Sequence, residues 1–138
     1  LFDCPPTLGL LMVNALAAAD HVIIPTQTEP LALHGLKGMC RTAEMIQRSR
    51  HRELPVSILP TLYDKRTRTG ADTLKAMQDE YGERVWNDAI PNDTRICSVD
   101  VLTRSSPAAA YPGRGLSAYR RALDWLLLTE ARDTEQAA

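Results

Sequence analysis

Two short runs rich in β-branched residues set the strongest limit on how this chain can fold. In residues 21–25 the β-branched residues are continuous rather than alternating with polar ones, which is typical of a strand in a parallel sheet with both faces covered. Residues 56–62 predict the next strand. Between them, the apolar residues of the stretch 31–50 recur at steps of three and four, which predicts an amphipathic helix. Strand, helix and strand in this order predict a parallel βαβ unit.

The same alternation continues along the rest of the chain. Residues 10–19 are apolar almost all round, which predicts a helix that is buried or lies at an interface. Residues 71–81 predict another amphipathic helix, ended by Gly82, and residues 84–90 predict a further strand at the edge of the sheet. The chain therefore predicts an α/β fold with a mainly parallel sheet.

A last helix precedes the C-terminus. We expect its core stripe to consist of five apolar residues: Leu116, Tyr119, Leu123, Leu126 and Leu127. Residues 130–138 are polar and predict a flexible tail. With 138 residues and a formal net charge of -1, the chain is expected to form a single domain over residues 1–129, followed by this tail.

The first nine residues place an acid shortly before two prolines. Asp3 follows two apolar residues that look like the end of a buried strand, where ligands bind in α/β sheets. A carboxylate at this position can hold a magnesium ion through water. Pro5 and Pro6 keep the chain extended until Gly9 admits a helix. Taken alone, the pattern also fits an acid that caps a helix and prolines that end a strand.

Five segments, in this order and at this spacing, resemble the ParA/Soj/MinD-like ATPases, which position DNA and protein cargo in bacteria. They are residues 3–11 (DCPPTLGLL), 14–20 (NALAAAD), 25–29 (PTQTE), 61–67 (TLYDKRT) and 90–95 (IPNDTR). The chain departs from that family after Arg95, where the family places an acid and an alanine and this sequence has Ser98-Val99-Asp100. The role of residues 98–106 is therefore left open.

The resemblance implies a P-loop NTPase-like fold, with helices on both faces of the sheet, that binds ATP and Mg²⁺. It implies that Asp3 is the catalytic residue that orders the magnesium through water. It also implies the cofactor-binding residues: Pro5, Pro6 and Thr7 as the switch beside the γ-phosphate, and Asp64, Pro91, Asn92 and Asp93 near the adenine. From the residues alone, 91–93 are equally well explained by an Asx turn at the end of a strand.

The resemblance also implies a DNA-binding surface. Arg66 and Arg95 match arginines by which the family binds DNA non-specifically, and Lys65 and Arg68 add charge beside Arg66. Phosphate contacts need only positive side chains on one surface, so a local patch suffices in a chain of nearly balanced charge. The alternative for each arginine is an ordinary solvated loop residue.

The chain contains no G-x-x-x-x-G-K-[ST] motif, so we expect the phosphate-binding loop to lie upstream and the chain to be the C-terminal portion of a longer protein. The implied function is an ATPase that dimerises with ATP bound, binds nucleoid DNA as that dimer and is discharged by a ParB-like partner. Its cargo is a chromosome, a plasmid or a chemotaxis array. The alternative is a truncated, non-catalytic binding or dimerisation module.

Several other functional classes find no support in the sequence. There is no H-E-x-x-H or G-x-S-x-G motif, which argues against a zinc protease or an α/β-hydrolase. The three cysteines form no C-x-x-C pair, which argues against a disulfide framework or a zinc site. No signal peptide or long apolar run occurs, so we expect a cytoplasmic location, at the nucleoid or a cell pole, and no membrane span.

Overall fold

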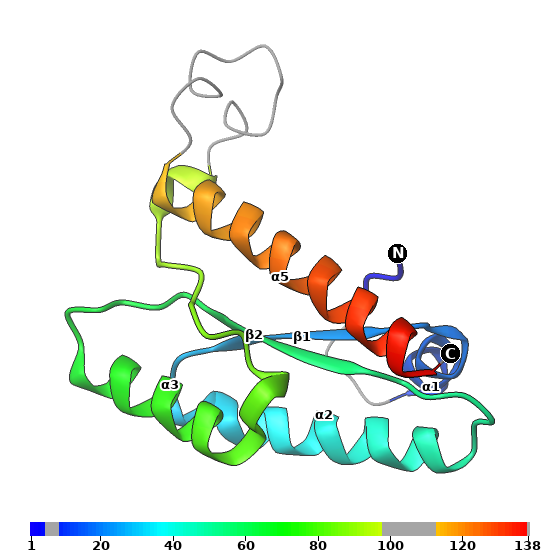
Figure 1. The fold of residues 1–138 in the computed structure, drawn as a ribbon. Coiled ribbons are helices and arrows are strands. Elements are labelled where there is room, and N and C mark those ends of the chain that lie inside the picture. The colour runs from blue at the N-terminus through cyan, green and yellow to red at the C-terminus, as the bar shows by residue number, and fades with distance from the viewer. Residues whose placement is uncertain (5–8, 98–112, 138) are drawn as a thin grey trace.

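The computed structural model describes residues 1–4, 9–97 and 113–137. Its elements, in chain order, are α1 (Leu10–Ala18), β1 (Val22–Gln27), α2 (Pro30–Arg48), β2 (Val56–Thr61), α3 (Arg68–Tyr81), the 3₁₀ helices η1 (Gly82–Arg84) and η2 (Thr94–Cys97), and α5 (Arg114–Ala137). The two strands are parallel, with Val22 opposite Val56 and Gln27 opposite Thr61. Helices α2 and α3 lie on one face of the sheet and α5 on the other (Figure 1). The predicted βαβ unit is confirmed.

The face covered by α2 and α3 holds the larger core. Ile58 of β2 and Met77 of α3 are completely buried, and Leu36 of α2 is 2% exposed. Each such side chain stabilises the fold by about 1.5–3 kcal/mol relative to an exposed position. α2 starts with a proline in its first turn, where the missing N–H costs no hydrogen bond, and its predicted apolar stripe faces this core.

The opposite face is packed by small side chains of α5. Ala118 and Ala122 are almost fully buried and, with the half-buried Trp125, pack on the β2 side of the sheet. The predicted core stripe of this helix is wrong at Tyr119, Leu123 and Leu127, which are 44%, 55% and 55% exposed, whereas Leu116 and Leu126 are partly buried. Alanines let the helix approach the sheet closely, and these three larger side chains then point outward.

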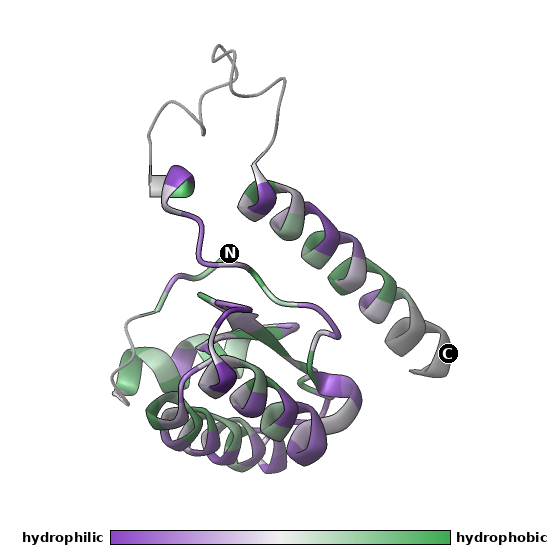
Figure 2. Ribbon diagram, turned by 90° about the vertical axis from the view of Figure 1, so that its left-hand side faces the viewer, coloured by the Kyte–Doolittle hydropathy of each residue, from purple (hydrophilic) through white to green (hydrophobic). Residues whose placement is uncertain are grey.

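β1 and α1 bury less than their composition predicts. Along β1, Val22, Ile24 and Thr26 are buried but Ile23 is exposed, because α5 covers β2 and the following segment rather than β1. The expected burial of both faces of this strand is therefore not observed in the structure. α1 is hydrophobic along most of its length (Figure 2). It turns Met12 and Leu16 inward and leaves two further leucines exposed, Leu10 and Leu11.

The predicted strand over residues 84–90 is wrong as a continuous strand. The chain follows β2, since Trp86 N donates to Ile58 O at 3.0 Å and Ile90 N donates to Pro60 O at 2.9 Å. Only isolated bridges result, however. Between these two contacts, the side chain of Asp88 accepts the backbone N–H of Ala89 at 2.8 Å, which draws the backbone away from regular pairing.

The C-terminal segment that was predicted to be a flexible polar tail is helical in the structure. α5 continues through Ala137, because glutamate, glutamine, arginine and alanine are all good helix formers although most of them are polar. α3 begins at Arg68 rather than at residue 71, and Gly82 ends it as predicted. Within the described residues, no helix combines the length and the apolar character needed to cross a membrane.

Candidate functional site

Two loops meet at the carboxyl end of β2, on the left side of Figure 1. Tyr63 N donates to Ile90 O at 2.9 Å, and Asn92 N donates to Tyr63 O at 2.9 Å. These two bonds bring the segments after Thr61 and after Ile90 side by side. The carboxyl ends of parallel strands are where α/β sheets bind ligands, so the two loops form the candidate site.

The first loop turns sharply before it reaches Asp64. Leu62 has a φ of 53°, in the left-handed region that a leucine rarely adopts. Such strain persists only when the surroundings hold it, and it is common at functional sites. The main-chain oxygen of Asp64 then accepts from Thr67 N at 3.0 Å and from Thr67 Oγ1 at 2.9 Å. Because Thr67 Oγ1 also caps α3 by accepting from Gly70 N at 3.3 Å, the loop is fixed to the helix that follows.

Asp64 and Arg66 form a two-pronged ion pair within this loop. Arg66 Nε lies 3.0 Å from Asp64 Oδ1 and Arg66 Nη2 lies 2.7 Å from Asp64 Oδ2, while Arg66 N donates to Oδ1 at 3.0 Å. The guanidinium of Arg66 and then its backbone N–H lower the pKa of Asp64 to about 2, and Arg114 contributes from the start of α5. Asp64 is therefore a carboxylate at neutral pH.

Asp93 and Arg95 repeat the arrangement in the second loop. Arg95 N and Nε donate to Asp93 Oδ1 at 3.2 and 3.1 Å, and Arg95 Nη2 donates to Oδ2 at 3.3 Å. Asp93 Oδ2 also accepts the backbone N–H of Gly115 at 3.1 Å, so the carboxylate caps the first turn of α5. Arg95 first and Gly115 next lower the pKa of Asp93 to about 2. The side chain of Asp93 is only 5% exposed.

The start of α5 adds two residues that the sequence did not single out. A Cβ on Gly115 would lie 2.0 Å from Ile96 Cδ1 and 3.2 Å from Asp93 Cβ, so only glycine fits against the second loop. Arg114 is exposed and close enough to Asp64 to lower its pKa. A cation at a helix N-terminus opposes the helix dipole. The unusual Gly-Arg-Gly start of a helix is the sequence signal for this region.

The remaining predicted residues lie in different surroundings. Asp3 is exposed and belongs to no strand, and within the described part of the chain no hydrogen bond or ion pair joins it to either loop. Pro5, Pro6 and Thr7 lie outside the described residues. Their roles, and that of Asp3, stay predictions.

Lys65 and Arg68 lie on the surface beside Arg66. Lys65 is exposed, and the side chain of Arg68 is 95% exposed with Nε 3.7 Å from Asp72 Oδ2. Pro91 is partly buried, and Asn92 is exposed. The structure thus brings the predicted adenine segment and the predicted DNA arginines to one rim of the sheet.

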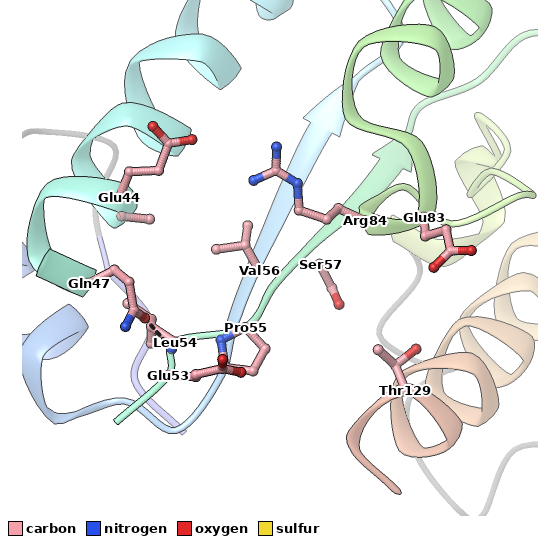
Figure 3. A pocket seen from close by; sticks show the side chains of 11 residues that line it. Glu44, Gln47, Glu53, Leu54, Pro55, Val56, Ser57, Glu83, Arg84 and Thr129 are labelled. Carbon is pink, nitrogen blue, oxygen red and sulfur yellow. Dashed lines mark hydrogen bonds between the residues drawn. The ribbon is translucent and has the colours of Figure 1, made fainter. Parts of the chain in front are cut away.

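A pocket of about 500 Å³ lies at the opposite end of the sheet (Figure 3). Its polar lining includes Glu44 and Gln47 of α2, Glu83 and Arg84 of η1, and Thr129 of α5. None of the predicted site residues lines it. No sequence motif marks this pocket, because its walls come from four separate segments.

A serine, a histidine and an acid approach one another beside this pocket. His21 Nε2 lies 2.8 Å from Ser57 Oγ, and His21 Nδ1 lies 4.0 Å from Glu130 Oε1. Ser57 is 2% exposed, which leaves its hydroxyl no room to attack a substrate. The contact therefore links α5 to the sheet. Among the described residues, no group of three or more metal-ligating side chains is gathered in one place.

Known proteins share both the sequence and the fold of this chain. A family model described as an AAA domain matches residues 1–56. The sporulation initiation inhibitor protein Soj of Bacillus subtilis is 33% identical over 119 residues, which are 86% of this chain and 46% of that protein. The chromosome partitioning protein ParA of Caulobacter vibrioides is 37% identical over 97 residues, which are 70% of this chain and 36% of that protein. The chain belongs to the ParA/Soj-like family of ATPases.

A solved structure resembles this ParA/Soj-like chain as a fold. Cobyrinic acid a,c-diamide synthase from Mycobacterium smegmatis, with bound ADP and magnesium, is 36% identical with a TM-score of 0.68. The match covers 91% of this chain and 44% of that one. The predicted family and the P-loop NTPase-like α/β fold are thereby confirmed. The ParA/Soj-like chain spans less than half the length of these three relatives.

Proposed function

We propose that this chain is the C-terminal part of an ATPase that dimerises when ATP is bound and then binds DNA without sequence preference. The observation that carries the proposal is the meeting of two Asp-x-Arg turns at one rim of the sheet. Arg66 and Arg95 are 85% and 64% exposed, whereas the acids beside them belong to the segments expected near the adenine. A nucleotide bound at this rim would therefore adjoin the residues that contact DNA.

The residues present fit one end of the nucleotide. The rim offers the carboxylate of Asp64, which is 27% exposed and can accept a hydrogen bond of the kind an adenine amino group donates. The carboxylate of Asp93 is only 5% exposed and already accepts from Arg95 and Gly115. The phosphate-binding loop is not among these 138 residues, so the fit concerns the adenine end alone. Asp3 is proposed to hold Mg²⁺ through water, and Pro5, Pro6 and Thr7 to form the switch. A single carboxylate is typical of magnesium bound with ATP, where the ion neutralises phosphate charge.

The cellular role follows from the named relatives. Chromosome-partitioning relatives make nucleoid DNA the proposed partner, a ParB-like protein the proposed activator and the cytoplasm the proposed location. A protein cargo such as a chemotaxis array is a variant of the same switch. A non-catalytic dimerisation module is the alternative from a different class.

The DNA-binding part of the proposal is tested by a salt titration. In the complete protein with saturating ATP, Arg66→Ala and Arg95→Ala are each expected to weaken binding to any DNA sequence alike. Each should also lower the salt slope by about one for every phosphate that the protomer no longer neutralises.

Arg52→Ala is the matched control for this titration. It removes the same charge from an exposed ion pair with Asp20 at the opposite end of the sheet. Unchanged affinity and slope in both test variants would leave these arginines as solvated loop residues. That result would favour a switch that positions protein cargo through another surface.

The enzymatic part is tested at Asp3. In the complete protein, Asp3→Ala is expected to abolish magnesium-dependent ATP hydrolysis, because it removes the carboxylate proposed to order the ion. The circular dichroism spectrum should be unchanged, since Asp3 is exposed and contributes no core volume. Turnover at the wild-type rate in this variant would refute the assignment of Asp3. Absence of ATP hydrolysis in the unmutated complete protein would instead favour the non-catalytic module.

A further inference from the structure

Both arginines proposed for DNA binding are already bound to carboxylates of their own turns. Arg66 donates Nε and Nη2 to Asp64 at 3.0 and 2.7 Å, and Arg95 donates the same two groups to Asp93 at 3.1 and 3.3 Å. A phosphate binds a guanidinium best through two adjacent N–H groups. In both turns the edge that carries Nε and Nη2 is therefore occupied by an acid.

The charges of each turn also cancel. Non-specific DNA affinity depends on positive side chains that replace the counterions of the phosphates. A carboxylate about 3 Å from each guanidinium offsets that positive charge and repels an approaching phosphate. The phosphate must displace the acid or bind the remaining Nη1 beside a negative group. Either route weakens the contact relative to a free arginine.

We propose that Asp64 and Asp93 act as charge locks, which compete with DNA phosphate for Arg66 and Arg95 and so hold DNA affinity down. The inference rests on the proposed function, because it assigns a task to the acids only if the arginines contact DNA. It adds to that function a limit on DNA affinity that is already present in the protein without DNA. Binding then requires release of an existing ion pair in each turn.

The two locks differ in how the acid is held. Asp64 is 27% exposed and depends on its own loop for its hydrogen bonds. Asp93 is 5% exposed and is fixed by Gly115 at the start of α5. When a phosphate arrives, the carboxylate of Asp93 stays in place and the side chain of Arg95 has to swing away from it. Asp64 and Arg66 can separate by movement of either partner.

Substitution by asparagine removes the negative charge of each acid but keeps the hydrogen bond that forms the turn. Asp64→Asn and Asp93→Asn keep a side-chain oxygen to accept the backbone N–H of Arg66 or Arg95, so the turn is retained. They remove the negative charge that holds the guanidinium. Each variant is expected to tighten DNA binding about two- to fivefold and to make the salt slope steeper by about one.

The matched control is Asp20→Asn. Asp20 Oδ1 lies 2.6 Å from Arg52 Nη1, and both side chains are exposed, so the same charge is removed from an arginine–aspartate pair on another surface. These residues precede β1 and β2, at the end of the sheet away from the two turns. DNA affinity is expected to stay unchanged in this variant.

The experiment is a salt titration of ATP-dependent DNA binding in the complete protein, with the ATP affinity of each variant measured first so that ATP is saturating throughout. It includes the double variant Asp64→Asn with Arg66→Ala. A lock has no effect once its arginine is gone, so this double variant should bind like Arg66→Ala alone. The same comparison applies to Asp93→Asn in the Arg95→Ala background.

The outcomes separate this inference from the function on which it rests. If the arginine variants weaken DNA binding but the asparagine variants do not tighten it, the locks are refuted and the function stands. Tighter DNA binding by Asp20→Asn would show a general charge effect and would also refute the locks. The same conclusion would follow if an asparagine substitution tightened DNA binding equally with and without the arginine of its turn. If neither the arginine nor the asparagine variants change DNA binding, the proposed function itself fails.

Discussion

The turn at Asp64 and the turn at Asp93 share one hydrogen-bond pattern but lie in different surroundings. In both, the acid accepts the backbone N–H and the guanidinium of the arginine two residues later. The Asp64 turn lies on the surface and leads into α3, whereas the Asp93 turn is packed under the start of α5. A local Asp-x-Arg sequence therefore sets the pairing, and the tertiary contacts decide whether the turn also supports the fold.

Alanine substitution of the glycine beside each turn is expected to give the largest difference in stability between the two regions. Gly115→Ala should destabilise the chain by about 1–3 kcal/mol, because its Cβ would lie 2.0 Å from Ile96 Cδ1 and 2.7 Å from Ile96 Cγ1. Gly70→Ala should destabilise the chain less than Gly115→Ala. Its Cβ would meet Thr67 Oγ1 at 2.9 Å and the main-chain oxygen of Asp64 at 3.3 Å, but the better helix propensity of alanine, by about 1 kcal/mol, offsets part of this cost.

Urea denaturation of the two glycine variants gives the comparison. Equal stability of Gly115→Ala and Gly70→Ala would show that α5 does not pack tightly on the Asp93 turn. An unchanged m-value in both variants would show that the change lies in stability and not in the compactness of the unfolded chain.

The sequence predicted the fold where hydrophobic periodicity decides the structure. The order β1, α2, β2 and α3 follows from apolar spacing and from turn residues, and the structure confirms it. The face that α5 buries was not predictable in this way. Leucines give a stronger apolar signal than alanines, yet Ala118 and Ala122 lie against the sheet because their small size allows close packing.

The candidate site was predictable in part. The spacing of the acid and the arginine in Asp64–Arg66 and in Asp93–Arg95 is local, so their pairing can be inferred from an i, i+2 pattern. The contact between Asp93 and Gly115 joins residues 22 positions apart and depends on where α5 starts. Nothing in the local sequence encodes that distance. The strand expected at 84–90 was wrong for a local reason instead, since the side chain of Asp88 competes there with the sheet for the backbone N–H of Ala89.

Removing each acid is expected to have a smaller effect than the glycine change, and an unequal one. Asp93→Ala should lower the midpoint of thermal unfolding by several degrees, because Gly115 N at the start of α5 loses its acceptor. Asp64→Ala should lower it less, because the Asp64 turn is exposed and water can replace the carboxylate. Asp93→Asn is the matched control. Its single side-chain oxygen can face either Arg95 N or Gly115 N but not both, so it should recover only part of the loss. A midpoint lowered equally in Asp93→Ala and Asp64→Ala would remove the difference between the two turns.

The smallest effect is expected in the pH dependence, where the two acids should respond differently to loss of their arginines. The pKa of Asp64 and that of Asp93 are each about 2, below the ordinary value near 4. Because the pKa is lower in the folded chain than in the unfolded chain, both pairs stabilise the fold fully above about pH 4. This stabilisation is lost as the pH falls towards 2.

Titration of the carboxyl carbons by NMR, from neutral pH down to acid unfolding, measures both pKa values directly. In Arg66→Ala the pKa of Asp64 should rise most of the way towards its ordinary value, since the guanidinium that lowers it most is gone and only the backbone N–H of residue 66 still donates. In Arg95→Ala the pKa of Asp93 should rise less, because Gly115 N still donates to the carboxylate besides the backbone N–H of residue 95. A complete return of the Asp93 pKa in Arg95→Ala would show that the helix start contributes nothing to this carboxylate, and the two turns would then differ only in exposure.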